Sequence, residues 1–345
     1  MQILLVKTSS LGDVVHNLPV IDDLRAALPG VQIDWLVEQA FVEVPRLHPG
    51  VRTVIPCALR RWRRAPFSAT TRAEWAAMRV QLRAERYDLI VDTQGLIKSA
   101  LLACLAQGPR AGFDRESVRE SLASRFYQRR FPVARALHAL ERNRQLVGLA
   151  AGYLLTRAPS YGLDVAAGVA SAGPVHIPLP SVWDAATPFA VLLHSTARDE
   201  KLWPESLWIA LARDLHSRLG IRSVLPWGSE VERERSERLA QAIPEAQVPA
   251  RTGLTTLAHG LACARVVIGV DTGLLHLASA VGARCIGIYV ASDPARNGLY
   301  PDSVGLNLGG VGMLPGADDV LAAVLQATLQ APLQVTPQVT AGLPE

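Results

Sequence analysis

Short apolar runs alternate along this chain with longer stretches in which apolar residues recur every three or four positions. The predicted strands lie at residues 3–6, 31–37, 51–55, 89–92, 189–193, 221–225, 266–270 and 285–289, and most of them are almost wholly apolar, whereas 31–37, 51–55 and 221–225 also contain polar residues. The helical patterns lie at residues 14–28, 71–86, 96–106, 135–155, 204–219, 230–242, 273–280 and 318–330. Continuous apolar runs are typical of strands buried on both faces, and helices connect such strands in parallel sheets. The pattern therefore predicts an α/β protein with doubly wound, Rossmann-like sheets.

A proline-rich segment interrupts this alternation near the middle of the chain. Five prolines fall between residues 157 and 188, where they would break any long helix. A length of 345 residues also fits two domains. Because ligands of doubly wound sheets bind outside the carboxyl ends of the strands, we expect a central cleft that both domains face. The predicted organisation is a first domain at 1–160, a connector at 161–187, a second domain at 188–317, a closing helix at 318–330 and a loose tail at 331–345.

The composition is that of a globular protein. Hydrophobic residues make up 49% and charged residues 19%, which excludes wholesale disorder. No apolar run reaches the ~18 residues of a membrane-spanning helix, and the apolar start of the chain is too short for a signal-peptide core. Cys57, Cys104, Cys263 and Cys285 lack metal-ligand spacing and stand among apolar residues, which predicts buried free thiols. We therefore expect a cytoplasmic protein.

Charge is distributed unevenly between the two halves. Residues 1–160 hold 23 lysines and arginines against 14 acids, whereas residues 161–345 hold 12 against 17. A basic half indicates an anionic partner, which could be a nucleic acid, a lipid surface or a phosphorylated substrate. Residues 46–86 alone contain ten arginines and two acids. The densest part of this segment, residues 60–64, suits bidentate binding of carboxylates or phosphates, although a solvated loop is the simpler alternative.

The loop after the first strand carries the first candidate for chemistry. Residues 8–13 connect the carboxyl end of a strand to a helix N-terminus, where free N–H groups and the helix dipole favour anions. Asp13 stands in the first turn of that helix. It either complements the helix dipole, or it faces the cleft as a general base that takes a proton from a substrate hydroxyl.

A loop of the second half has a similar position after a strand. In the segment 194–204, hydroxyl groups, an arginine and Lys201 precede a helix that begins near Pro204. Such a loop suits a pyrophosphate. An ordinary capped loop is the alternative, but it leaves the lysine unexplained.

A second loop of this half ends in a carboxylate, a hydroxyl and a glycine. Gly273 allows the backbone to approach a ligand closely, and Thr272 with the free N–H groups of the next helix can hold phosphate. Asp271 precedes them without a second carboxylate at metal-ligand spacing, so no metal site is expected. His276 lies one turn inside the helix and is either part of the site or a satisfied helical histidine.

Several functional classes lack their motifs in this sequence. There is no G-x-G-x-x-G and no G-x-x-x-x-G-K-[ST], which argues against dinucleotide-dependent enzymes and P-loop NTPases. Aromatic residues make up only 6%, without an interleaved stacking platform or a known nucleic-acid motif. Nucleic acid is therefore not the expected partner.

Six short segments occur in order along the chain and point to a known family. They are VKTSSLGDVVH at 6–16, RRWRR at 60–64, DTQGLIKSA at 92–100, HSTARDEKLWP at 194–204, LPWG at 225–228 and DTG at 271–273. Together they resemble the lipopolysaccharide heptosyltransferases, and the resemblance covers residues 1 to about 330. It implies a GT-B glycosyltransferase fold, with an acceptor-binding domain first and a nucleotide-sugar domain second.

The resemblance also implies an activity. The expected reaction is transfer of L-glycero-D-manno-heptose from ADP-heptose to a Kdo residue of Kdo2-lipid A, in the synthesis of the lipopolysaccharide inner core. It would invert the anomeric carbon and need neither a metal nor a cofactor. The expected location is peripheral, on the cytoplasmic face of the inner membrane.

Residue roles follow from the same resemblance. Asp13 is the expected general base. Of the donor contacts, Lys201 and Thr272 are expected toward phosphate and Asp271 toward the heptose. The full set of expected donor contacts is Thr196, Lys201, Asp271, Thr272, Gly273 and His276. The expected acceptor contacts are Ser10, Gly12, Arg60, Arg61, Arg63, Arg64 and Arg119.

The sequence departs from the family pattern at two places. Ala197 stands where the family often has a second threonine, and residues 289–294 differ from the usual glycine-containing turn. Both departures bear on donor preference more than on the reaction class. Two other functions stay open at this point: a heptosyltransferase II-type enzyme with a heptose acceptor, and a non-catalytic protein that binds anionic glycolipid or nucleic acid.

Overall fold

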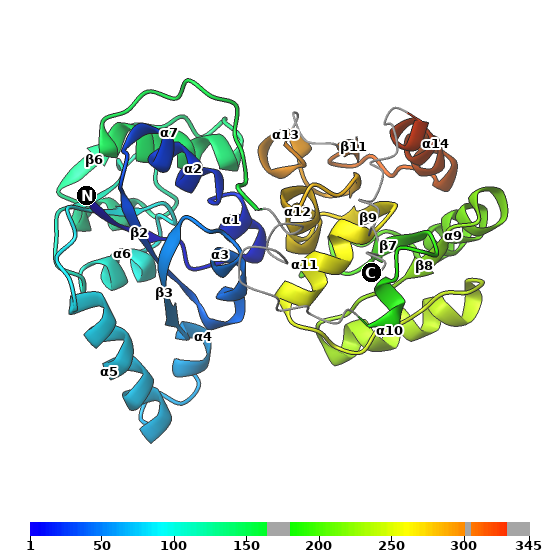
Figure 1. The fold of residues 1–345 in the computed structure, drawn as a ribbon, viewed down its shortest axis with the longest axis horizontal. Helices are drawn as coiled ribbons and strands as arrows, with labels where there is room; N and C mark the ends of the chain where they lie inside the picture. The colour runs from blue at the N-terminus through cyan, green and yellow to red at the C-terminus, as the bar shows by residue number, and fades with distance from the viewer. Residues whose placement is uncertain (164–179, 301–304, 330–345) are drawn as a thin grey trace, which may run out of the picture.

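The computed structural model describes residues 1–163, 180–300 and 305–329, and these form two parallel sheets that lie side by side (Figure 1). The first sheet has the order β3-β2-β1-β4-β5-β6 and the second the order β11-β10-β9-β7-β8. Every paired strand is parallel to its neighbour. Both orders are doubly wound, so each sheet has a switch point where the strand order reverses, between β1 and β4 and between β7 and β9. The predicted fold class is confirmed.

The first half holds six strands and the helices that cover them. Its strands are β1 Gln2–Val6, β2 Gln32–Glu38, β3 Val51–Cys57, β4 Leu89–Asp92, β5 Arg110–Phe113 and β6 Arg129–Phe131. Its α-helices are α1 Leu11–Val15, α2 Pro19–Ala27, α3 Glu43–Arg46, α4 Leu59–Trp62, α5 Ala69–Arg83, α6 Ile97–Ala103 and α7 Ala139–Ala151. Two 3₁₀ turns span Gln39–Phe41 and Ser121–Phe126.

The second half repeats this plan, with five strands among its described residues. They are β7 Phe189–Leu193, β8 Arg222–Val224, β9 Val266–Val270, β10 Cys285–Tyr289 and β11 Gly305–Gly309. Its α-helices are α9 Glu205–Leu219, α10 Glu230–Ala242, α11 Leu254–Cys263, α12 Gly273–Ala280, α13 Pro294–Asn297 and α14 Ala317–Leu329. Two 3₁₀ turns span Ser181–Trp183 and Asp199–Lys201. The last helix, α14, packs against α9 and the strands β10 and β11 of this same half.

The strands alternate their side chains between two apolar layers, as the period of a strand requires. In β1, Ile3 and Leu5 face one layer, while Leu4 and Val6 face another that belongs to the first half. The layer of Ile3 and Leu5 continues into the second half through Leu275 of α12. One apolar core therefore runs across both halves and holds the two sheets against each other.

The predicted helix at 14–28 is wrong in one respect, because the chain breaks it in two. Pro19 has no backbone N–H to donate and stands at the first position of α2, so α1 ends at Val15 and a short turn separates the helices. The predicted helix at 135–155 is shorter than expected. It begins after His138, whose side chain accepts from the Leu140 N–H, and it ends at Gly152, whose φ of 81° is left-handed.

Other elements were not predicted at all. The strands β5, β6 and β11 and the helix α11 occur in segments whose patterns gave no assignment. Two of the four cysteines also differ from expectation, since Cys104 and Cys263 are exposed at helix ends while Cys57 and Cys285 are buried. Most of the predicted connector and the whole tail at 331–345 lie outside the described residues, so the domain limits stay predictions. Within the described ranges, none of the helices has the length and apolarity needed to cross a membrane.

Candidate functional site

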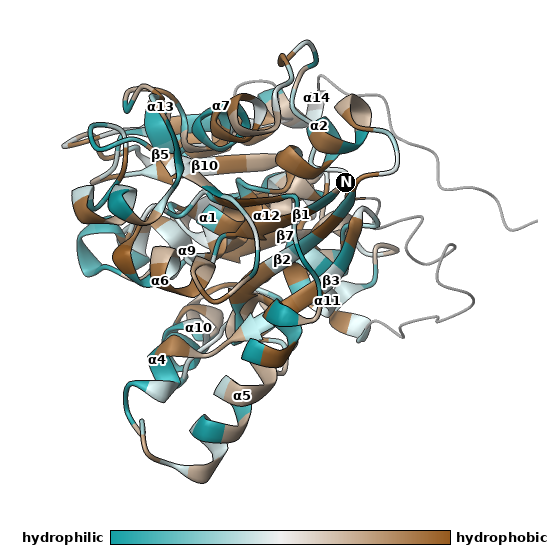
Figure 2. Ribbon diagram, turned by 90° about the vertical axis from the view of Figure 1, so that its left-hand side faces the viewer, coloured by the Kyte–Doolittle hydropathy of each residue, from teal (hydrophilic) through white to brown (hydrophobic). Residues whose placement is uncertain are grey.

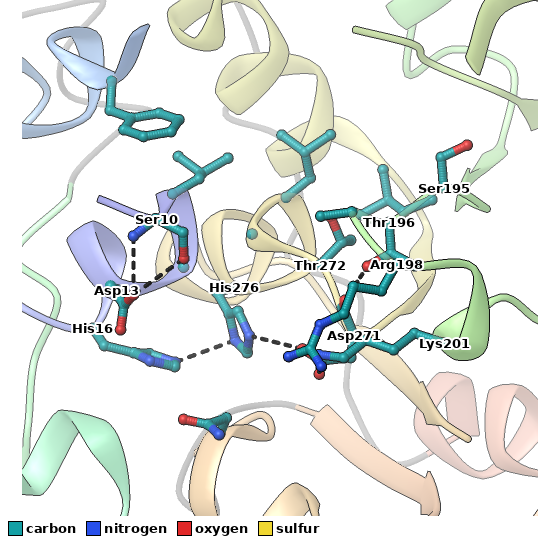
Figure 3. Close-up of a pocket in the computed structure, with 18 of the residues that line it drawn as sticks. Ser10, Asp13, His16, Ser195, Thr196, Arg198, Lys201, Asp271, Thr272 and His276 are labelled. Atoms are coloured by element: carbon teal, nitrogen blue, oxygen red, sulfur yellow. Dashed lines mark hydrogen bonds and ion pairs between the residues drawn. The ribbon is translucent and has the colours of Figure 1, made fainter. Parts of the chain in front are cut away.

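A cleft of about 560 Å³ lies where the carboxyl ends of the two sheets meet. Its walls are the loops and helix starts that follow β1, β7 and β9, three of the four strands at the switch points. Figure 3 shows Asp13 and His16 on one side, and Asp271, Thr272 and Lys201 on the other. The predicted site residues that line the cleft are Ser10, Gly12, Asp13, Arg60, Arg119, Thr196, Lys201, Asp271, Thr272, Gly273 and His276.

Asp13 is held in place by the start of its own helix. Ser10 donates to Asp13 Oδ2 from its backbone N–H at 2.9 Å and from its hydroxyl at 3.2 Å, which forms the first turn of α1. Arg119 Nη1 lies 3.6 Å from the same oxygen. The side chain stays 22% exposed toward the cleft, and no described residue hydrogen-bonds Oδ1. One carboxylate oxygen is therefore fixed and the other is available to a ligand.

Positive charges beneath Asp13 keep it ionised. Burial by itself would raise the pKa of Asp13, but Lys7, Arg119 and the Ser10 hydrogen bonds outweigh burial and bring the pKa below its ordinary value. Lys7 is buried and donates to Thr93 O at 2.8 Å and Asn143 Oδ1 at 3.3 Å. Burial lowers the pKa of Lys7 to about 8. Lys7 is thus a cation at neutral pH that stabilises the Asp13 carboxylate from the protein side.

The loop after β4 supports the loop that carries Asp13. Gln94 Oε1 accepts the N–H groups of Thr8 at 3.1 Å and Ser9 at 3.0 Å. Asp92 in turn fixes this loop, since its Oδ1 accepts the Gln94 N–H at 2.9 Å. The loop after β4 therefore stabilises the loop after β1, across the first switch point.

Asp271 stands at the matching place in the second half but has different neighbours. Lys201 Nζ lies 2.5 Å from its Oδ2, and His276 Nε2 lies 3.9 Å from its Oδ1. Its side chain is only 12% exposed. Burial would raise the pKa of Asp271, but His276 and Lys201 bring it far below its ordinary value. Both oxygens of this carboxylate therefore face protein groups, in contrast to Asp13.

The N-terminus of α12 is open toward the cleft. Thr272 precedes the helix, and its side chain does not cap the N–H groups of the first turn. The Leu275 N–H already donates to Thr272 O at 3.1 Å, whereas no described residue accepts the N–H groups of Gly273 and Leu274. These two N–H groups and the Thr272 hydroxyl therefore remain available to an anion. Thr196 is committed to the protein instead, because its Oγ1 donates to Asp271 O at 2.9 Å. Thr196 thereby joins the β7 loop to the β9 loop.

The two halves touch most closely at the starts of α1 and α12. A Cβ added to Gly273 would lie 2.6 Å from Leu11 Cβ and 2.9 Å from Gly12 N, and one added to Gly12 would lie 2.9 Å from His276 Cδ2. Beside this contact His16 Nε2 lies 3.2 Å from His276 Nδ1. Glycine is thus required on both sides, and the contact sets the separation between Asp13 and the α12 N-terminus.

The arginine cluster is divided by the fold. Arg60 lines the cleft, whereas Arg61, Arg63 and Arg64 do not. Arg61 Nη2 instead binds Glu74 at 2.8 Å, and the same carboxylate accepts from Trp62 Nε1 at 2.8 Å. Glu74, one of the two acids of the segment 46–86, therefore occupies Arg61, because α5 folds back along α4.

Several lining residues were missed from the sequence. His16 was present in a quoted motif but had no role, and the contact that brings it to His276 spans 260 residues of sequence. Glu232 lines the cleft beside the N–H groups of Gly228 and Ser229, and the S-x-x-E spacing of a capping box could have located it. Asn297 of α13 has no motif that could have indicated it.

Comparison with known proteins identifies the family. The model for glycosyltransferase family 9 (heptosyltransferase) matches residues 75–315. The chain belongs to glycosyltransferase family 9. It is 44% identical over 302 residues to lipopolysaccharide heptosyltransferase 1 of Pseudomonas aeruginosa, covering 87% of this chain and 81% of that one. It is 43% identical over 301 residues to the enzyme of the same name from Escherichia coli K12, covering 87% and 91%.

Solved structures of family 9 agree with this assignment. E. coli heptosyltransferase WaaC with ADP superposes with a TM-score of 0.85 at 39% identity, over 95% of this chain and 100% of that one. WaaC with ADP-2-deoxy-2-fluoro heptose has a TM-score of 0.81 at 40% identity, over 94% and 99%. This member of family 9 is therefore a GT-B glycosyltransferase, a heptosyltransferase of lipopolysaccharide synthesis.

Proposed function

We propose that this protein transfers L-glycero-D-manno-heptose from ADP-heptose to a Kdo residue of Kdo2-lipid A, with inversion at the anomeric carbon and without a metal. The observation that carries the proposal is the pair of facing loops: an ionised Asp13 on one wall of the cleft, and Lys201 with the open N-terminus of α12 on the other. The similarity to a WaaC structure bound to an ADP-heptose analogue supports the donor.

Asp13 has the geometry of a general base. A sugar hydroxyl is a poor nucleophile, and a carboxylate with a lowered pKa is a weak base, so proton transfer accompanies the attack rather than precedes it. In the proposed step the acceptor oxygen bonds to the anomeric carbon while its proton passes to Asp13 Oδ1. The bond from the anomeric carbon to the ADP oxygen breaks on the opposite face, and its electron pair leaves with ADP.

The second half stabilises the departing ADP in this proposal. The free N–H groups of Gly273 and Leu274 and the Thr272 hydroxyl bind the pyrophosphate oxygens. Lys201 supplies the positive charge that offsets the charge gathered by the leaving group. Asp271 orients Lys201 and His276 through the contacts described above. The part of its side chain that remains exposed in the cleft faces the heptose.

The first half holds the acceptor. Arg60 and Arg119 line the cleft on the side of Asp13, where they face an acceptor that carries carboxylates and phosphates. Ser10 and Gly12 shape the wall beside them. Because the acceptor is a lipid, we place the enzyme peripherally on the cytoplasmic face of the inner membrane.

The test is an assay that pairs ADP-heptose with Kdo2-lipid A in the presence of EDTA. We expect release of ADP together with a heptosylated product, at the same rate with and without the chelator, and NMR of the product is expected to show an anomeric configuration opposite to that of the donor. Retention of configuration or loss of activity in EDTA would contradict the mechanism.

The acceptor is tested in the same assay with a second lipid. Heptosyl-Kdo2-lipid A, in which the first heptose is already in place, is expected to accept no sugar. Preference for this lipid would make the protein a heptosyltransferase II-type enzyme.

A further inference from the structure

The segment from α4 to α5 projects from the first half as an arm. Figure 2 shows α5 extending away from the two sheets, with the connection from α4 at the far end of the projection. We call residues 58–83 the basic arm and the connection at residues 63–68 its tip. Its base is fixed to the first sheet, because Glu38 of β2 accepts the N–H groups of Leu59 at 3.3 Å and Arg60 at 3.2 Å.

The arm is an ordered unit and not a loose loop. Trp62 of α4 is buried against Trp75 of α5, with ring centroids 5.4 Å apart. Glu74 ties the two helices together through Arg61 and Trp62. Ser68 caps α5 by accepting the Thr71 N–H at 3.1 Å. The tip is therefore presented in a fixed shape.

The tip exposes a large apolar side chain among cations. Phe67 is 86% exposed, and Arg63 and Arg64 precede it in the same loop, both exposed. A single exposed apolar side chain needs no explanation by itself, and Leu154 is equally exposed. Phe67 differs because it stands at the end of a projecting arm beside two exposed arginines, and this combination is what points to a partner.

Helix α5 continues this surface with a basic stripe. Arg72, Arg79 and Arg83 are exposed and spaced seven and four residues apart, which places them on one face of the helix. Val80 is exposed beside the stripe. The single acid within the arm, Glu74, already binds Arg61 and Trp62, so the charge that the arm presents outward is positive.

We propose that the basic arm docks this enzyme on an anionic phospholipid bilayer, with Phe67 inserted at the interface and the arginine stripe of α5 against the headgroups. Aromatic side chains and arginines are the groups that a lipid interface receives together, because the ring enters the acyl boundary while the cations remain at the phosphates. Near the base of the arm, Arg60 lines the cleft, and the tip lies at the other end of the projection. The basic arm therefore connects the membrane surface to the cleft that binds a lipid-borne acceptor. In this respect the inference rests on the proposed acceptor.

Vesicle binding by the full chain tests the docking. The vesicles contain phosphatidylcholine alone or phosphatidylcholine with phosphatidylglycerol, and binding is measured by co-sedimentation at low and high salt. We expect binding to the anionic vesicles only, weakening with salt. Phe67→Ser is expected to lower the vesicle affinity about tenfold. The double variant Arg72→Gln/Arg79→Gln is expected to lower it roughly fivefold for each charge.

Matched variants on other surfaces serve as controls. Leu154 is also 86% exposed but follows α7, so Leu154→Ser should bind vesicles like the unaltered protein. Arg213→Gln/Arg218→Gln removes two exposed arginines from α9 of the second half and should also bind normally. Equal losses in the control variants, or unchanged binding by Phe67→Ser, would overturn the proposal. If the protein bound RNA or DNA through the arm and bound vesicles of neither composition, the arm would be assigned to nucleic acid instead.

Activity separates the docking from the proposed function. Phe67→Ser is expected to keep its rate with a deacylated, water-soluble Kdo acceptor and to lose rate only with Kdo2-lipid A embedded in anionic vesicles. If the unaltered protein uses neither acceptor but still binds vesicles through the arm, the proposed acceptor fails while the docking stands. If Phe67→Ser is as active as the unaltered protein on the embedded acceptor, the docking has no part in acceptor access.

Discussion

Asp13 and Asp271 stand at equivalent places in the two halves of this heptosyltransferase. Each lies beyond the carboxyl end of a strand at a switch point, beside the start of the helix that follows, and each faces the same cleft. Their surroundings differ. Asp13 has one oxygen fixed by Ser10 and the other unbonded among the described residues, whereas Asp271 has one oxygen on Lys201 and the other facing His276.

This difference supports different roles for the two identical side chains in the proposed reaction. A general base needs an oxygen that a substrate proton can reach, which Asp13 has. A carboxylate that is occupied on both sides acts instead by orienting the cation and the imidazole that it touches. The sequence pattern of a buried strand followed by an aspartate therefore predicts a position and not a role. The following variants test the distinction.

The largest effect is expected for Asp13→Asn. The amide keeps the shape and can still accept from Ser10, but it cannot take a proton, so kcat should fall roughly 100- to 10,000-fold with the donor KM almost unchanged. Steady-state kinetics on both substrates measures this. Asp214→Asn on α9, which removes a carboxylate that contacts Arg218, is the control and should keep full activity. A kcat within a few-fold of normal for Asp13→Asn would end the assignment of this residue as the base.

Asp271→Asn is expected to act through binding and not through proton transfer. Without the carboxylate, Lys201 and His276 lose the group that orients them, so kcat/KM for the donor should fall on the order of 100-fold. Loss of a charged hydrogen bond should also lower the free energy of unfolding by about 2 kcal/mol. A kinetic profile identical to that of Asp13→Asn, with an unaltered donor KM, would remove the contrast between the two aspartates.

Gly273→Ala tests the contact that sets the distance between the two loops. The new methyl group would lie 2.6 Å from Leu11 Cβ, so α1 and α12 must separate and kcat should fall about tenfold, with overpacking that costs about 1–3 kcal/mol of stability. Gly310→Ala is the control, because the nearest atom there is Met313 Sδ at 3.9 Å. Full activity in Gly273→Ala would show that the separation is not critical.

Lys7→Met tests the charge beneath Asp13 through the pH profile. Removing the cation raises the pKa of Asp13, since Lys7 is the first of the charges that lower it. The base is active as the carboxylate, so the acid limb of kcat/KM should move to higher pH. Lys98→Met, at an exposed lysine of α6, should leave the limb where it is. If the acid limb of kcat/KM stays at the same pH in Lys7→Met, the group that titrates on that limb is not Asp13.

The smallest effect is expected within the arginine cluster. Arg60→Gln removes a cation from the cleft wall and should raise the acceptor KM about tenfold while sparing the donor KM. Arg61→Gln removes a cation that already binds Glu74, outside the cleft, and should change the acceptor KM less than twofold. If Arg61→Gln raised the acceptor KM more than Arg60→Gln does, the arm would have to rearrange when the acceptor binds.

Local patterns in the sequence were sufficient for much of the fold. Buried strands such as residues 89–92 and 266–270 are continuous apolar runs, and the structure has strands at both places. Short segments with few apolar residues gave no such signal, which is why β6 with its sequence Arg-Arg-Phe was missed. Its strand character comes from pairing with β5 and not from its own side chains.

What the sequence by itself determined is which loops carry candidate chemistry to the cleft. The loop after a buried parallel strand must lie at the carboxyl edge of its sheet, so the loops at 8–13, 194–204 and 271–273 were placed there by their local neighbours, together with Asp13, Lys201 and Asp271. What only the tertiary structure decided is which groups these side chains meet. The Lys201–Asp271 pair joins residues 70 positions apart, and the His16–His276 contact joins residues 260 positions apart. No local pattern encodes such distances, because they depend on how two separately wound sheets pack on one shared core.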